Sequence, residues 1–131
     1  MIPHPLTERF ARLEASIAAR KGDFVLFALF LREGAPNRWD LLVAAPWLGE
    51  DQQAAVGYLV GEVKSVIGAD ALLSLSHIVV VDPYHAELQD FNRYVQVEHG
   101  DIEIRDRDIF GQTIKEAHVI TSKRPAAPAV K

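Results

Sequence analysis

The chain has 131 residues, which is enough for one domain with one hydrophobic core. Hydrophobic residues make up 49% and charged residues 24%, a composition typical of soluble globular proteins. The formal net charge is -4, which argues against a nucleic-acid partner because phosphate contacts need clustered Lys and Arg. The absence of Cys excludes disulfides, thiolate metal sites and Cys nucleophiles.

The sequence shows no targeting or membrane-spanning segment. The N-terminal stretch MIPHPLTERF lacks the basic start and apolar core of a secretory signal. No apolar run approaches the roughly 20 residues that a membrane helix needs. We therefore expect a cytoplasmic protein with no membrane partner.

The first predicted element is an amphipathic helix. Its apolar residues recur at steps of four, three and four, at Leu6, Phe10, Leu13 and Ile17. Thr7 is a candidate N-cap, and Gly22 is a typical stop signal.

Two strands follow this helix. Residues 25–31 are apolar without a break, which indicates a strand covered on both faces. The turn residues EGAPN occupy 33–37, and residues 38–46 form a second strand ended by Pro46. The short link predicts that the two strands pair antiparallel.

The middle of the chain predicts a helix, a strand and a second, shorter helix. Residues 51–67 carry a helical apolar stripe, and Gly68 stands where a C-terminal glycine is common. Residues 73–82 form a third strand. Asp82-Pro83 is typical of an N-cap followed by a first-turn proline, which predicts a helix from Pro83 to about Asn92.

The C-terminal part predicts further strands and a tail. Val95/Val97 and Ile102/Ile104 are mirrored about EHGD, a hairpin signature, and residues 111–122 form the last strand. The tail at 123–131, KRPAAPAVK, has too little apolar content to pack, so we expect it to be mobile. The predicted fold is a single α+β domain at 1–122, in which helices pack on a mixed sheet in the order α-β-β-α-β-α-β-β(-β).

The stretch RWDLLVAAPWL, residues 38–48, sets Asp40 at the head of an apolar strand. Together with the order helix, strand, strand, helix, strand, it resembles the core of the minimal nucleotidyltransferases. In that family the second strand carries two acidic residues one apart, and a later strand supplies a third carboxylate. These carboxylates hold two divalent metals that orient a nucleoside triphosphate. The resemblance assigns Asp40 to the second acidic position and Asp82 to the third carboxylate.

The sequence departs from the pattern of that family at two points. The first acidic position is Arg38, and no Gly-Ser pair lies upstream, where only Gly34 is found. Replacing one carboxylate of three by Arg would leave the two Mg²⁺ ions under-coordinated, because Mg²⁺ prefers hard oxygen ligands. The resemblance therefore implies a degenerate nucleotide- or metal-binding relative rather than an active transferase. The same stretch also resembles small bacterial proteins of unassigned function, which implies no mechanism.

Asp40 also has a purely structural interpretation. An Asp at the start of a strand commonly caps the preceding turn through its side chain, and Arg38 is close enough in sequence to pair with it. Both interpretations stay open at this stage.

Histidines and carboxylates in the middle of the chain allow a metal site. His77, Asp82 and His85 lie close in sequence, and His118 lies on another predicted strand. Such ligands suit Zn²⁺ or Fe²⁺. Helix capping explains Asp82 and His85 equally well. The candidate ligand or metal site is thus Asp40, Asp82 and His85, and the sequence assigns no cofactor and no catalytic residue.

Two tryptophans are candidate anchors for a protein partner. Trp39 lies at the start of the second strand, and Trp47 follows its end. For both residues, packing in the core is the competing interpretation. A small sheet with several apolar strands must also hide its edges, and a symmetric homodimer does so. Two hypotheses result: a non-enzymatic protein-interaction or regulatory module, and a degenerate nucleotidyltransferase-like protein that binds a nucleotide or a metal.

Overall fold

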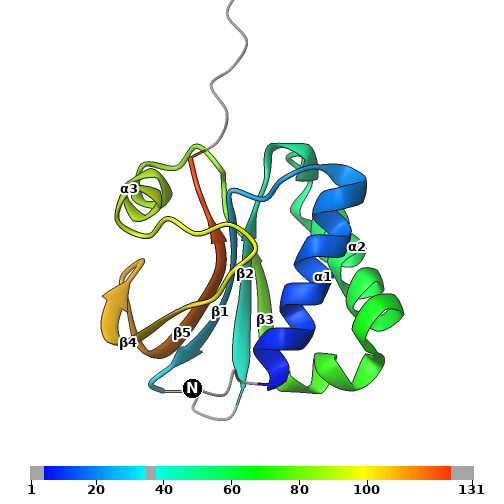
Figure 1. Cartoon of the computed structure of the whole chain (residues 1–131), viewed down its shortest axis with the longest axis horizontal. Helices are drawn as coiled ribbons and strands as arrows, with labels where there is room; N and C mark the ends of the chain where they lie inside the picture. The colour runs from blue at the N-terminus through cyan, green and yellow to red at the C-terminus, as the bar shows by residue number, and fades with distance from the viewer. Residues whose placement is uncertain (1–4, 35–37, 125–131) are drawn as a thin grey trace, which may run out of the picture.

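A five-stranded mixed sheet organises the chain, of which the computed structural model describes residues 5–34 and 38–124 (Figure 1). The strands are β1 (Leu26–Arg32), β2 (Trp39–Ala44), β3 (Leu75–Val80), β4 (Ile102–Ile109) and β5 (Gln112–Ser122). Their order across the sheet is β3-β2-β1-β5-β4, in which β2 and β3 pair parallel and the other neighbours antiparallel. The α+β class is confirmed. The bracketed last strand of the predicted order forms as β5, whereas the strand predicted around Val95 and Val97 does not form.

Helices cover both faces of the sheet (Figure 1). Two lie on one face, α1 (Pro5–Lys21) and α2 (Gln52–Glu62), and α3 (Ala86–Tyr94) lies on the other. Three short helical segments lie between β2 and β3, before and after α2: η1 (Pro46–Leu48), the π-helical η2 (Val63–Ile67) and η3 (Ala69–Ser74). Among the described residues, no helix has the length and hydropathy required to cross a membrane.

The central strand β1 explains the unbroken apolar run. Phe27 and Leu29 pack into the core beneath α1 and α2, while Ala28 and Phe30 pack into the core beneath α3. Because successive side chains alternate between faces, a strand with a helix on each side is apolar throughout. The predicted antiparallel pairing of the first two strands is confirmed by the β1–β2 register.

The predicted helix ends are partly right. Asp51 caps α2, since its Oδ1 accepts a hydrogen bond from the Ala54 N–H at 3.1 Å. Gly68 ends the π-helical turn with φ of +104°, as its position in the sequence predicts. The Thr7 cap is wrong, because α1 already begins at Pro5 and Thr7 is a buried residue inside the helix.

The hairpin predicted at residues 94–105 is also wrong. Val97 makes only an isolated bridge to Ser122, and β4 pairs along its length with β5 instead. The reversal comes at Phe110-Gly111, where both residues have positive φ, +52° and +77°. This is the backbone of a two-residue type I′ turn, which usually carries Asn-Gly or Asp-Gly, so Phe-Gly gave no signal.

The short helix begins later than the sequence predicts. His85, not Asp82, is the N-cap of α3, because its Nδ1 accepts from the Glu87 N–H at 3.1 Å. Of the predicted tail, Lys123 is held by backbone and side-chain hydrogen bonds, and residues 125–131 lie outside the described residues.

Candidate functional site

Asp40 is a buried carboxylate at the start of β2, with 6% of its surface exposed. Arg32 Nε donates to its Oδ2 at 2.7 Å, and His77 Nδ1 lies 3.3 Å from its Oδ1. The sheet register produces this contact, because Asp40 pairs with Phe30 on β1 and with His77 on β3. The charge of Asp40 is therefore balanced by a guanidinium from β1.

The expected partner of Asp40 is a different arginine. Arg38 instead directs its Nε to the carbonyl of Leu73 at 3.4 Å. Arg38 lies two residues before Asp40 and would share its face of an extended strand. The antiparallel neighbour β1 nevertheless places Arg32 closer to Asp40. The antiparallel pairing predicted from the sequence, combined with its register, was the signal that could have identified Arg32.

Asp40 lies in the wall of a cavity of about 450 Å³. Arg32, Asp40 and His77 supply polar groups at the sheet, and His85 and Glu87 supply them from the start of α3. The remaining lining is mostly apolar: Phe30, Leu42, Val79, Val81, Leu88, Ile109 and Phe110, with Gln112 as a further polar residue. A pocket with an apolar lining and a few polar groups is typical of a ligand site.

The three predicted site residues do not converge. Asp40 and His85 line the same cavity, whereas Asp82 lines a different one of about 430 Å³ beyond the C-terminal ends of β2 and β3. Asp82 Oδ1 accepts from the Tyr84 N–H at 2.9 Å, as an Asp in a turn commonly does. Because β2 and β3 run parallel, Asp40 at the start of β2 and Asp82 after the end of β3 lie at opposite ends of the pair.

The histidines weighed as metal ligands are also separated. His77 contacts Asp40, and His85 uses its Nδ1 to cap α3. His118 is buried on β5, where Nδ1 lies 3.1 Å from Asp101 Oδ1 and Nε2 lies 2.6 Å from Glu116 Oε2. Each imidazole thus has its own carboxylate or backbone partner, and the described residues place no common ion among them.

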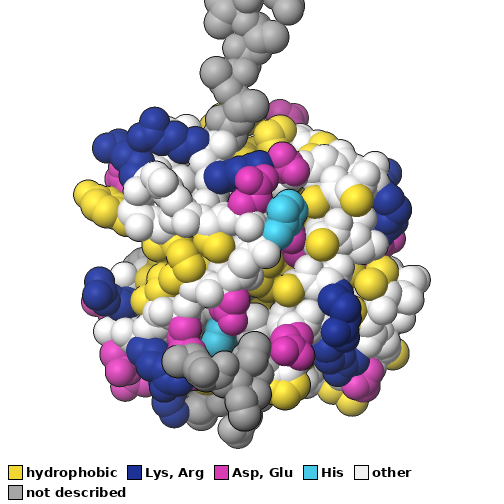
Figure 2. Space-filling view, viewed as in Figure 1, with side chains coloured by type: hydrophobic (Ala, Val, Ile, Leu, Met, Phe, Trp, Pro, Cys, Tyr) yellow, Lys and Arg dark blue, Asp and Glu magenta, His cyan; other side chains and the backbone are white. Residues whose placement is uncertain are grey.

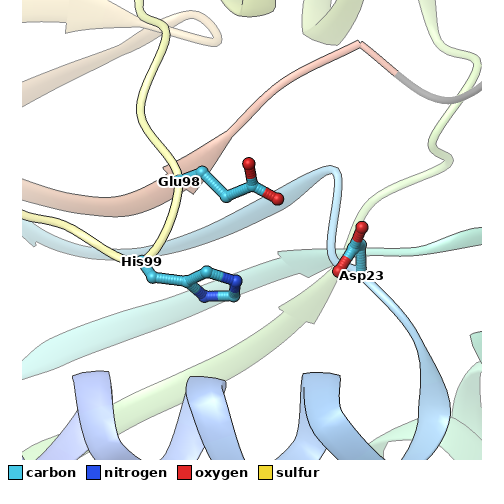
Figure 3. A group of neighbouring side chains, drawn as sticks. All are labelled: Asp23, Glu98 and His99. Atoms are coloured by element: carbon cyan, nitrogen blue, oxygen red, sulfur yellow. The ribbon is translucent and has the colours of Figure 1, made fainter.

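A different cluster gathers around His99, which was not a sequence candidate. Asp23, Glu98 and His99 bring ligand atoms within 4.8 Å of one another (Figure 3). The ammonium of Lys123 donates to both carboxylates, to Asp23 at 2.8 Å and also to Glu98. The hydrogen bond from Lys123 lowers the pKa of Asp23. The cluster is therefore an ion-pair network, with a lysine providing the positive charge.

Beneath this cluster, Glu14 of α1 is fully buried. His99 Nδ1 lies 2.8 Å from Glu14 Oε1, and Thr121 Oγ1 donates to Glu14 Oε2 at 2.9 Å. The hydrogen bond to Glu14 raises the pKa of His99. These contacts attach the loop that precedes β4 to helix α1.

Both tryptophans pack against the core. Trp39 is 8% exposed, and its ring centroid lies 5.6 Å from that of His118. Trp47 packs edge-to-face on Phe24 at 5.2 Å and donates through Nε1 to the carbonyl of Asp23 at 3.0 Å. Trp39 in particular has too little exposed surface in this structure to anchor a partner.

The two edges of the sheet differ in chemistry. β4 alternates charges along one edge in the sequence IEIRDRDI. β3, at the other edge, has the sequence LSHIVV, without Lys, Arg, Asp, Glu or Pro. Charged side chains, Pro and bulges are the usual devices that prevent an edge from pairing with another chain. Of these, β3 carries neither charge nor Pro, and its register shift against β2 lies at its start, between Leu75 and His77.

Comparison with known proteins adds no further assignment. No protein-family model, curated protein or solved structure matches the chain. The function must therefore be argued from the site residues and the strand edge alone.

Proposed function

We propose that this chain is a non-enzymatic protein-interaction module that pairs with a second copy of itself through β3, forming a homodimer. The observation that carries the proposal is the contrast between the charged β4 edge and the uncharged β3 edge. An edge strand without charged residues or Pro, and regular beyond a register shift at its start, favours pairing with another chain.

The backbone of β3 supports this pairing. The Val81 N–H donates to the carbonyl of Val43 on β2 at 2.8 Å. The backbone N–H and C=O groups of the neighbouring odd-numbered residues, His77 and Val79, therefore also point toward β2. Because backbone groups alternate sides along the regular part of the strand, from His77 onward, Ile78 and Val80 direct their N–H and C=O groups away from the sheet. The Gln52 side chain contacts the Val80 carbonyl at 3.3 Å, which leaves the centre of the edge open.

A two-fold axis at Ile78 would place the outward backbone N–H and C=O groups of one copy opposite the same groups of the second copy. In an antiparallel pair centred there, Ile78 faces Ile78 of the second copy, and Ser76 faces Val80. No charged residue of β3 opposes another across the axis. Leu73, 74% exposed just before the strand, would be partly covered by the second copy. The result is a continuous ten-stranded sheet, with each β4 as a charged outer edge.

Sedimentation velocity with one backbone variant tests the proposal. Ile78→Pro removes an outward N–H and leaves the bonds to β2 in place, as Pro at an edge strand does. The matched control, Ile78→Ala, keeps that N–H and also shortens the side chain. We expect the wild type and Ile78→Ala to sediment as dimers and Ile78→Pro as a folded monomer. A monomeric wild type, or an Ile78→Pro variant as dimeric as Ile78→Ala, would contradict the proposal.

A second candidate function is binding of a nucleotide or a divalent metal at Asp40, as the nucleotidyltransferase resemblance implies. The observation that favours it is that buried Asp40 and His85 share one cavity. A ligand present at 100 times its dissociation constant stabilises the native state by about 2.7 kcal/mol. Thermal unfolding with Mg²⁺, Mn²⁺ or Zn²⁺ and nucleotides should then show a shift that Asp40→Ala abolishes. The absence of any shift would exclude this candidate.

A further inference from the structure

A second surface, independent of the strand edge, lies between α3 and the β4–β5 hairpin. The Asp40 cavity and a neighbouring cavity of about 380 Å³ share Glu87, Ile109 and Phe110 in their linings. Figure 2 shows the corresponding hollow between α3 and β4, with hydrophobic side chains along it. We call the two joined cavities the α3 groove.

The floor of the α3 groove is aromatic and aliphatic. Phe110, at the tip of the hairpin, stacks on Phe30 at 6.1 Å between ring centroids and tilts against Phe91 at 5.4 Å. Tyr94, at the far end of α3, lines the groove and is 87% exposed. Exposed apolar surface that continues into a groove commonly marks a binding surface.

The charges along the groove are mostly negative. Its lining contains four carboxylates and two guanidiniums: Asp40, Glu87, Asp90 and Asp108, with Arg32 and Arg107. The Arg32–Asp40 pair neutralises itself at one end. Asp90 is paired with Arg93 of α3 at 3.2 Å, so the excess of negative charge rests on Glu87 and Asp108 against Arg107. This excess complements a cationic ligand.

The length of the groove suits a peptide. α3 spans nine residues, or about 13 Å at 1.5 Å per residue. That length accommodates two or three apolar side chains of a segment lying alongside it, as in helix-in-groove recognition. We propose that the α3 groove binds a basic amphipathic segment of a partner protein, with the apolar side chains of that segment on Phe110 and its Lys or Arg side chains near Glu87 and Asp108.

Fluorescence anisotropy with two synthetic peptides tests this assignment on the full chain. One labelled peptide alternates Leu and Lys at helical spacing, and the other carries Glu in place of every Lys. We expect the Lys peptide to bind with an affinity that weakens as salt increases, and the Glu peptide to bind at least about tenfold more weakly. Equal binding of the two peptides, or no saturable binding of the Lys peptide up to about 1 mM, would overturn the proposal.

Two variants locate the binding on the groove. Phe110→Asn preserves the turn, because Asn tolerates positive φ, and removes the aromatic floor. We expect it to weaken the Lys peptide about tenfold, whereas Asp106→Asn, on the same hairpin and outside the groove lining, should leave it unchanged. If both variants bind like the wild type, the peptide lies elsewhere and the proposal fails.

This outcome is separable from the self-association proposed above. Ile78→Pro changes the strand edge and leaves the lining of the α3 groove intact. A monomeric Ile78→Pro variant should therefore bind the Lys peptide with the same affinity per chain as the wild type.

Discussion

The contact between His99 and buried Glu14 predicts that stability depends on pH in a defined direction. The hydrogen bond to Glu14 raises the pKa of His99 above its ordinary value of 6.5. A histidine whose pKa is raised on folding stabilises the native state fully below its unfolded pKa. That contribution is lost as the pH rises through the folded pKa. The contact should thus contribute most near pH 6 and least near pH 9.

The substitution His99→Asn isolates the charge of the imidazolium. His99 has φ of +53°, a conformation that Asn adopts at little cost, so the backbone should be unchanged. A hydrogen bond to a charged group contributes about 1.5–3 kcal/mol. Because the His99 side chain is 45% exposed, solvent screening reduces this to about 1–2 kcal/mol near pH 6. Thr121 continues to donate to Glu14 in the variant.

Urea unfolding of the wild type and His99→Asn at about pH 6 and pH 9 measures this contribution. We expect the difference in free energy of unfolding to fall below about 1 kcal/mol at the higher pH, because the imidazole is then neutral. A difference that is independent of pH, or that grows toward pH 9, would refute the assignment of His99 as the titrating partner of Glu14.

Three further substitutions test other contacts by urea unfolding. Arg32→Leu should lower the free energy of unfolding by about 2–3 kcal/mol, because it leaves buried Asp40 without its guanidinium partner. Asp40→Asn should lower it by less, and the reverse order would show that the pair is not stabilising. Gly111→Ala should cost about 1 kcal/mol through its φ of +77° alone, since an added Cβ meets no atom within 4 Å. Leu88→Ala should cost about 2–5 kcal/mol, because Leu88 is a fully buried apolar side chain that packs α3 against the sheet, and a smaller loss would mean that α3 packs loosely.

Periodicity in the sequence was sufficient for most of the fold. The helical spacing from Leu6 to Ile17 and the unbroken run at 25–31 correspond to α1 and β1. These signals are strong because they are set by burial of one helix face or of both faces of a strand. The turn at Phe110-Gly111 was missed because its residues are atypical, and the strand pairing that it determines was then assigned to the wrong segment.

The candidate site could be predicted only in part. Asp40 and His85 do share a cavity, but the antiparallel pairing was predicted without its register, and the register is what identifies Arg32 as the partner of Asp40. The contact of His99 with Glu14 joins residues 85 apart in the chain, and no local pattern reports such a pairing. The difference between the two sheet edges likewise required the strand order.

Amide hydrogen exchange at the β3 edge tests the central claim most directly. In an isolated chain the outward N–H groups of Ile78 and Val80 face solvent and should exchange far faster than that of Val81, which is bonded to Val43. Self-association predicts that these two outward amides become protected as the protein concentration rises, while Val81 stays protected throughout. Fast exchange of Ile78 and Val80 at every concentration would contradict pairing through β3.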